Sequence, residues 1–193
     1  MKTLFILLLS SVMIFSACGN NNKTDQAGNT GIDSLQTLDS NPPSEAAPAG
    51  DLVTDYLELK NALATDNSNG AAAAAKKMNE TLSKVDASAF TEDQRKIYGD
   101  VKDDLIEHAE HIASNGSNIA HQREHFDMVS QDMIDLVKVT GTSQTLYQEF
   151  CPMYNNKKGA SWLSESREIK NPYYGKEMQE CGEVKEVFKP KEG

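Results

Sequence analysis

The sequence predicts a mainly α-helical protein, an antiparallel four-helix bundle with an irregular C-terminal segment packed on it. Apolar residues recur at helical spacing between about residues 52 and 137. The breaks between these periodic stretches are short, which favours antiparallel neighbours in an up-down bundle. After about residue 142 the periodicity is lost, and glycine, proline and aromatic residues become frequent. Because that last segment has no core of its own, we expect it to pack on the helices.

Residues 1–17 are expected to form an export signal that is removed from the mature protein. Lys2 supplies the positive charge, and a mostly apolar run follows it. The run is too short to cross a bilayer as a stable helix, which needs about 20 residues. The string Phe-Ser-Ala-Cys at residues 15–18 resembles a bacterial lipobox, which implies cleavage before Cys18 and acylation of that cysteine. The alternative is an ordinary secretory signal followed by a chance cysteine.

Residues 18–50 are expected to be the lipidated cysteine and a flexible tether. The segment is rich in Asn, Gly, Ser, Thr, Asp and Pro and has few large apolar residues. Such a composition buries too little surface to offset the entropy lost on ordering. We therefore expect one folded domain, at residues 51–188.

The first two helices are predicted from spacing and propensity. Residues three or four positions apart form the apolar stripe of the first helix: Leu52, Tyr56, Leu59 and Leu63. The stretch 65–70 interrupts this pattern. Alanine has the best helix propensity, so the alanines at 71–75 predict a second helix, which continues through Met78, Leu82 and Val85.

The third and fourth helices carry start and stop signals. Thr91-Glu92-Asp93-Gln94 has the pattern of a capping box, and Asn115-Gly116 is a plausible end. The stripe between these signals comprises Ile97, Val101, Leu105, His108 and Ile112. The stripe of the fourth helix comprises Ile119, Phe126, Met133 and Val137, and Gly141 is expected to end that helix.

The charge and the motifs exclude several classes of function. The chain has 29 acidic and 19 basic side chains and a formal net charge of −10, and Lys2 is the only charge in the leader. This acidity argues against binding nucleic acid, which requires a basic patch. The sequence has no glycine-rich phosphate loop, no G-x-S-x-G elbow, no C-x-x-C pair and no haem attachment motif. We therefore do not expect an enzyme.

One enzyme motif does occur in the sequence. The residues from His121 to His125 match H-x-x-E-H, a zinc-protease pattern with two ligands and a general base. The match fixes only three residues. The helical wheel also turns Glu124 away from the apolar stripe, whereas a protease helix lines a buried cleft. We do not favour a zinc hydrolase for these reasons.

The two cysteines that remain after removal of the leader each have a methionine nearby. These residues form a cysteine-methionine block at 150–182: Cys151, Met153, Met178 and Cys181. Thiolates and thioethers are soft ligands that select Cu(I) and other thiophilic ions. Disulfides also persist in an oxidising envelope compartment. The block therefore has two interpretations, a soft-metal site and a disulfide between the two cysteines, with the methionines as core gap-fillers in the second.

The four histidines of the chain lie between residues 108 and 125. His108 falls in the middle of an apolar stripe, and we interpret it as a core residue. His111 lies at the margin of that stripe and His125 on a flank of the next helix. His121 lies nearer to solvent, but it is four residues from His125, so both can present nitrogens on one face. Imidazole suits Zn, Cu, Fe and Ni, although each of these histidines could also be an ordinary surface residue.

Five strings occur together in the second half of the chain: Gln122–Phe126, Phe150–Met153, Gly159–Ser164, Ile169–Gly175 and Met178–Gly182. Together they resemble a bacterial envelope domain of unknown function. That domain occurs as a lipoprotein on its own and also with periplasmic adaptor subunits of heavy-metal efflux pumps. The likeness covers about residues 52–187. It implies an association with copper or related heavy-metal handling, and it supports the cysteine-methionine block as a candidate ligand set.

From these patterns we expect a lipoprotein of the bacterial cell envelope, held on the lipid bilayer by acylated Cys18, with its domain in the periplasm or at the cell surface. It would bind a soft metal, Cu(I) foremost, with another soft ion or Zn(II) as alternatives, for buffering or for handover to an efflux adaptor. The expected metal-binding residues are Cys151, Met153, Met178, Cys181, His111, His121 and His125. The alternative is a structural or interaction module that a Cys151–Cys181 disulfide clamps.

Overall fold

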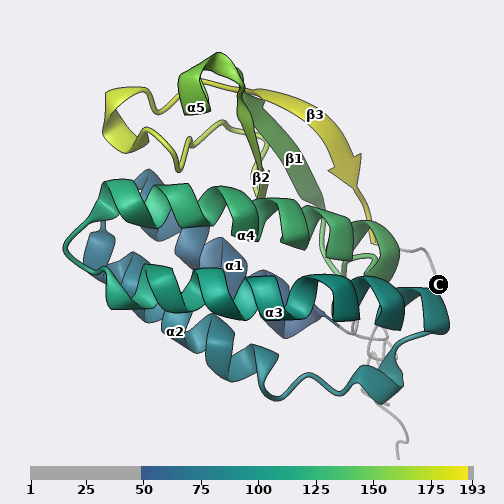
Figure 1. Ribbon diagram of the computed structural model, residues 1–193. Helices are drawn as coiled ribbons and strands as arrows, with labels where there is room; N and C mark the ends of the chain where they lie inside the picture. Colours follow the sequence, from purple (N-terminus) through teal and green to yellow (C-terminus); the bar gives the residue numbers. More distant parts are fainter. Residues whose placement is uncertain (1–48, 191–193) are drawn as a thin grey trace, which may run out of the picture. The chain divides into compact units, whose positions relative to one another are not determined.

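The computed structural model describes residues 49–190 (Figure 1). The expected leader, the Cys18 lipidation site and all but the last two residues of the expected tether lie outside the described residues. Within them, the chain is mainly helical, with four long helices and a small antiparallel sheet near the C-terminus. The long helices are α1 (Gly50–Ala64), α2 (Ser68–Leu82), α3 (Glu92–Ser114) and α4 (Ile119–Thr140). The strands are β1 (Leu146–Cys151), β2 (Ala160–Ser164) and β3 (Glu183–Phe188), and the short helices are η1 (Ala87–Ala89), α5 (Tyr154–Lys157) and η2 (Gly175–Glu177).

Three of the four long helices, α2, α3 and α4, begin at residues whose side chains cap them. The predicted capping box of α3 is present, because Thr91 Oγ1 accepts a hydrogen bond from the backbone N–H of Gln94 and Gln94 Oε1 accepts one from the N–H of Thr91. The side chains of Asn67 and Asn118 accept hydrogen bonds from backbone N–H groups in the first turns of α2 and α4. The four predicted helices are therefore confirmed, although α2 ends at Leu82 and does not continue through the predicted Val85.

Helices that follow one another in the sequence pack side by side, α1 on α2, α2 on α3 and α3 on α4 (Figure 1). A four-helix bundle fits this arrangement. The break after α1 covers residues 65–67 rather than the expected 65–70, because Asn67 caps α2 early. The predicted stripes supply much of the buried core: Leu52, Tyr56, Leu59, Leu63, Leu105, Ile112, Phe126, Met133 and Val137.

The C-terminal segment is more regular than expected, and this corrects the sequence prediction. β1 lies in the middle of a sheet with the order β2-β1-β3, and both pairings are antiparallel. None of these strands of five or six residues alternates strictly between apolar and polar side chains, so the sequence has no clear strand signal here. The fully buried Glu149 also breaks the alternation in β1. In the observed register Phe150 faces Glu183 of β3, so the residues that precede Glu183 lie near the end of β1.

The sheet lies against the helices through β2, which contacts α4 and α1 (Figure 1). The backbone N–H of Leu163 donates a 3.0 Å hydrogen bond to the Tyr56 hydroxyl, which lies 2.8 Å from Ser130 Oγ on α4. The ring of Tyr173 packs 5.6 Å from that of Phe126, measured between centroids. The predicted packing of the aromatic C-terminal segment on the helices is confirmed by these contacts.

Arg123 of α4 fixes the loop that precedes η2. Its Nε donates to the carbonyl oxygen of Pro172 at 2.8 Å, and its Nη2 donates to the carbonyl oxygen of Leu63 at 2.9 Å and to Asp66 Oδ1 at 2.7 Å.

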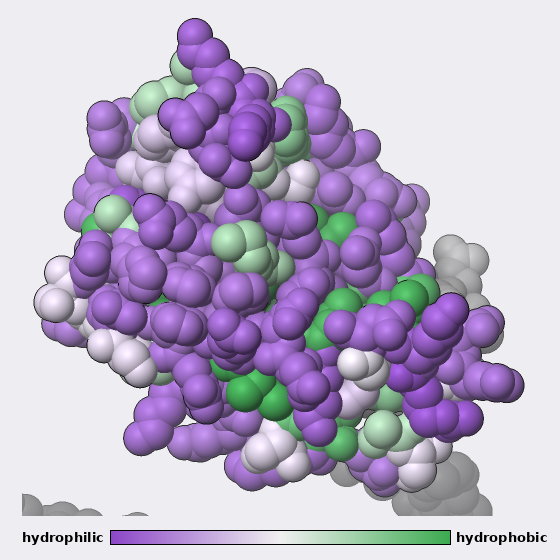
Figure 2. All heavy atoms as spheres, in the orientation of Figure 1, coloured by the Kyte–Doolittle hydropathy of each residue, from purple (hydrophilic) through white to green (hydrophobic). Residues whose placement is uncertain are grey.

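The face drawn in Figure 2 is mainly hydrophilic, with small, separated hydrophobic areas. Among residues 49–190 no helix is long and apolar enough to cross a membrane.

Candidate functional site

The two cysteines of the described chain meet in space. Cys151 is the last residue of β1 and is fully buried, and Cys181 is half-buried in the loop between η2 and β3. Both are free thiols, and they lie close enough together for the Cys151 thiol to raise the pKa of Cys181. The sheet register explains this contact, because the antiparallel pairing of β1 with β3 brings the residues before Glu183 to the end of β1.

Asn171 holds the loop that carries Cys181 in place. Its side-chain Nδ2 donates a 2.6 Å hydrogen bond to the carbonyl oxygen of Cys181, and its backbone N–H donates to the carbonyl oxygen of Gln179 at 2.9 Å. Asn171 Oδ1 accepts hydrogen bonds from the backbone N–H groups of Tyr173 and Tyr174. The side chain is fully buried, so these bonds form where water cannot replace them.

Burial and the neighbouring Cys151 thiol raise the pKa of Cys181 to about 11, against a smaller lowering by a hydrogen bond from the backbone N–H of Met153. At neutral pH the thiol of Cys181 is therefore protonated. A cation that binds there must displace this proton, since the thiolate is the metal ligand. At neutral pH the protonated thiol is therefore a poor metal ligand, and only a strongly thiophilic cation would bind there.

The two methionines of the block lie beside the cysteines along the backbone. The carbonyl oxygen of Met178 accepts a 3.0 Å hydrogen bond from the N–H of Cys181. The carbonyl oxygen of Met153 accepts a 3.0 Å hydrogen bond from the hydroxyl of Tyr174. The side chain of Met153 is 44 % exposed, so this edge of the block is open to solvent.

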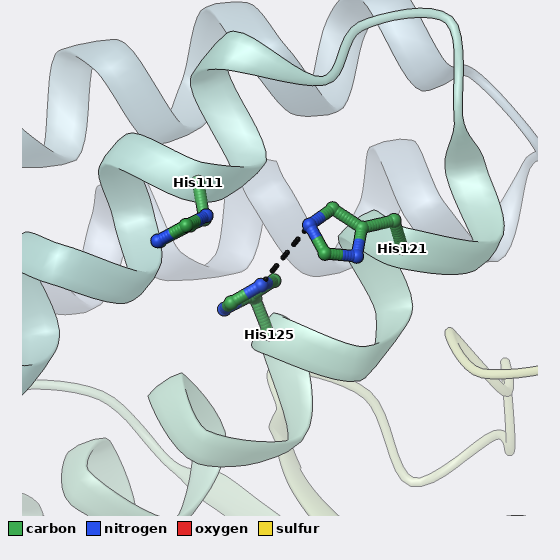
Figure 3. Close-up of side chains that lie close together, drawn as sticks. All are labelled: His111, His121 and His125. Carbon is green, nitrogen blue, oxygen red and sulfur yellow. Dashed lines mark hydrogen bonds between the residues drawn. The ribbon is translucent and has the colours of Figure 1, made fainter.

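The four histidines form a second cluster between α3 and α4. His111 comes from α3 and His121 and His125 come from α4, and Figure 3 shows the three rings close together. One nitrogen from each of the three lies within 4.8 Å of those of the other two. The Nε2 atoms of His121 and His125 are 3.2 Å apart. The expectation that His121 and His125 present nitrogens on one face is confirmed.

His108 also belongs to this cluster, although it was interpreted from the sequence as a core residue. It is half-buried, and its Nδ1 lies 3.0 Å from Nδ1 of His125. Burial, followed by the neighbouring imidazoles of His111, His121 and His108, lowers the pKa of His125. The ring of His125 is therefore neutral at pH 7, with a lone pair free to bind a metal. The position of His108 one turn before His111 was the signal for its membership.

The cysteines and the histidines are separate groups. Among residues 49–190 no histidine or carboxylate joins the two cysteines in a set of three donor residues whose atoms all lie within 4.8 Å of one another. The histidine cluster faces α3 from α4, whereas the cysteines lie at the end of β1. The seven expected metal-binding residues therefore divide into a sulfur group and an imidazole group.

Tyr174 and Asn171 lie beside the sulfur group; the sequence marked them only as members of the string Ile169–Gly175 and assigned them no role at the site. Burial, followed by the neighbouring Cys151 and Cys181, raises the pKa of Tyr174, so its hydroxyl stays protonated and donates to the carbonyl oxygen of Met153.

Glu124 has a different role from the one that the H-x-x-E-H motif implies. Its Oε2 lies 3.3 Å from His121 Nδ1, so it contacts a histidine ring and does not line a buried cleft.

A domain of the family described as "Protein of unknown function (DUF3347)" is found at residues 52–145. This range covers all but the first two residues of α1, the whole of α2 to α4 and the four histidines, but it ends before β1 and both cysteines. It fits the expectation of a domain of unknown function. No curated protein and no solved structure matches the chain.

Proposed function

We propose that this chain is a lipid-anchored protein of the bacterial cell envelope that binds a soft metal ion, Cu(I) foremost, without catalysing a reaction. The observation that carries the proposal is the contact between the thiols of Cys151 and Cys181, which are thirty residues apart in the sequence. Two thiols that converge at a partly buried site offer the ligands that Cu(I) prefers.

The chemistry of the pair suits a thiophilic ion better than a hard one. The raised pKa of Cys181 means that binding requires a cation able to displace a thiol proton. Thiolates bind Cu(I) strongly enough to do so, whereas Mg²⁺ and Ca²⁺ select oxygen ligands. Met153 and Met178 stand beside the cysteines as thioether ligands or as an outer sulfur shell, with an antiparallel helical bundle as the platform.

Exposure at one edge of the block supports buffering or handover as the role. Cys151 is fully buried, but Cys181 is half-buried and Met153 is 44 % exposed. A bound ion would therefore be reached from one side, where a partner with soft ligands could take it. The resemblance to domains that accompany heavy-metal efflux adaptors points to such a partner, and acylation of Cys18 would hold the chain at the membrane.

Anaerobic titration of the purified chain with Cu(I) tests the proposal. We expect one equivalent to bind to the wild type, with loss of two titratable thiols, and tight binding to disappear in a Cys151→Ser, Cys181→Ser double variant. Met153→Leu is expected to weaken binding, whereas Met128→Leu should not, since Met128 is a similarly exposed methionine on α4 (40 % exposed). Unchanged affinity in the double variant contradicts the proposal.

A second candidate function follows from the same contact between the thiols. If Cys151 and Cys181 are oxidised, the disulfide closes a loop of thirty residues and stabilises the fold by roughly 3 to 4 kcal/mol in the chain-entropy model. The chain would then be a structural or interaction module. Protein purified from the envelope with no titratable thiol and no retained copper favours this candidate over the metal site.

A further inference from the structure

We propose that His111, His121 and His125 form a metal site of their own, which is separate from the cysteine pair and takes a borderline divalent cation, Zn²⁺ or Cu²⁺. This goes beyond the soft-metal function proposed for the cysteines. The three residues are the only such set of three or more donor residues within residues 49–190. Imidazole nitrogen is a ligand that both ions favour.

The separation between two of the nitrogens already suits a tetrahedral ion. Nε2 of His121 and Nε2 of His125 are 3.2 Å apart. In a tetrahedral site with metal–nitrogen bonds of about 2.0–2.1 Å, two donor nitrogens lie roughly 3.3 to 3.4 Å apart. An ion can therefore bridge these two rings with almost no movement of α4, because the residues are four positions apart on one helix.

The remaining nitrogens of these two rings have partners that direct Nε2 toward an ion. Nδ1 of His121 lies 3.3 Å from Glu124 Oε2, and Nδ1 of His125 lies 3.0 Å from Nδ1 of His108. When both rings carry their proton on Nδ1, they donate to Glu124 and to His108 and leave both Nε2 lone pairs free. Metal-binding histidines commonly have such outer partners, which fix the tautomer and the orientation of the ring.

His111 supplies the third nitrogen from the neighbouring helix. Its ring now stacks on that of His125, with centroids 4.3 Å apart and an angle of 3° between the planes (Figure 3). Two stacked rings do not point their lone pairs at one ion, so binding requires the His111 ring to turn. This residue is exposed, and rotation of an exposed side chain meets little resistance. Turning His111 inward would close three ligands around the ion and leave a fourth position toward solvent.

Two acidic residues of α3 lie on the surface beside His111. Glu107 and Glu110 line the same shallow surface hollow as His111. Their charge raises the local concentration of cations but does not select an ion. Selection rests on the three imidazoles, which makes the acidic pair the appropriate control for non-specific binding.

Titration of the full chain with Zn²⁺ tests the proposal, and a Cys151→Ser, Cys181→Ser background keeps the sulfur pair out of the measurement. We expect one equivalent to bind in this background and to shift the ring NMR signals of the histidines, since the chain has four and all lie in this cluster. His111→Ala and His121→Ala are each expected to weaken binding by more than the roughly 10- to 100-fold that the loss of an outer partner costs. Glu124→Gln should weaken it by about tenfold, and Glu110→Gln by less than about twofold.

The outcomes separate this site from the one proposed for the cysteines. Loss of Zn²⁺ binding in the cysteine variant, or binding that leaves the histidine signals unchanged, overturns the imidazole site. Full affinity in His111→Ala also overturns it, and that variant changes an exposed side chain whose loss should not affect folding. Zn²⁺ binding retained by the cysteine variant, together with absence of Cu(I) binding by the wild type, supports the imidazole site and counts only against the sulfur site.

Discussion

The side chain of Asn171 donates a 2.6 Å hydrogen bond to the backbone carbonyl oxygen of Cys181, and through it the loop after η2 is fastened to the loop before it. Two backbone N–H groups donate to the Oδ1 of the same side chain. One buried amide thus determines where the Cys181 thiol lies relative to the end of β1. The geometry of the sulfur group depends on this residue, although it is not itself a candidate ligand.

Asn171→Ala is therefore expected to lower the free energy of unfolding by roughly 2 to 4 kcal/mol, because three buried hydrogen bonds are lost and their partners stay unpaired. The same variant should weaken Cu(I) binding. Denaturant unfolding with and without Cu(I) measures both effects. Gln179→Ala is the control, since the Gln179 side chain is exposed and only its backbone carbonyl contacts Asn171. Equal stability of the two variants would contradict the role given to Asn171.

Glu149 should make the fold less stable as the pH rises. It is fully buried, and its two carboxylate oxygens have no hydrogen-bond partner of good geometry among the described residues. Burial raises the pKa of Glu149 to about 7, with Lys60 and Trp162 opposing the shift and Glu165 adding to it. Because the folded state holds the proton more tightly than the unfolded state, the neutral form is favoured at low pH, and stability falls from about pH 4.5 up to about pH 7.

Glu149→Gln is expected to remove this contribution. The variant should match the wild type near pH 4.5 and exceed it by on the order of 1 to 3 kcal/mol at pH 8, because an amide needs no deprotonation in the buried site. Guanidinium unfolding at the two pH values checks this. Glu186→Gln, at an exposed position of β3, should show no such difference. A Glu149→Gln variant less stable than the wild type at pH 8 would show that the carboxylate is paired after all.

Two glycines offer opposite outcomes for the same substitution. Gly159 has φ of +81°, and a Cβ there would lie 2.1 Å from Cζ of Phe150. Gly159→Ala should therefore destabilise the fold by at least about 1 kcal/mol through backbone strain and a clash next to Cys151. Gly99 lies inside α3 with open space around its Cβ position. Gly99→Ala should stabilise by about 0.5 to 1 kcal/mol. Thermal unfolding of the two variants ranks them, and a stabilised Gly159→Ala would contradict the observed turn.

The helices could be predicted closely because their signals are local. The Thr91–Gln94 capping box, the Asn115 stop and the apolar stripes each depend on residues a few positions apart. The sheet could not be predicted, since three strands of five or six residues depend on pairing between distant segments, and a buried carboxyl at Glu149 interrupts the pattern. The helical wheel places His108 in the core, because a wheel shows which residues face the neighbouring helix but not which residues they meet there.

By itself, the sequence determined four helices, an acidic net charge and two small sets of side chains of types that can bind metals, because spacing and residue type act over one or two helical turns. Only the tertiary structure decided which of those side chains meet. Antiparallel pairing brought Cys151 to Cys181, and the packing of α3 on α4 brought His111 to His121 and His125. The expected single set of seven residues became two groups, because contacts between distant segments follow from the packing of whole elements, which no local pattern encodes.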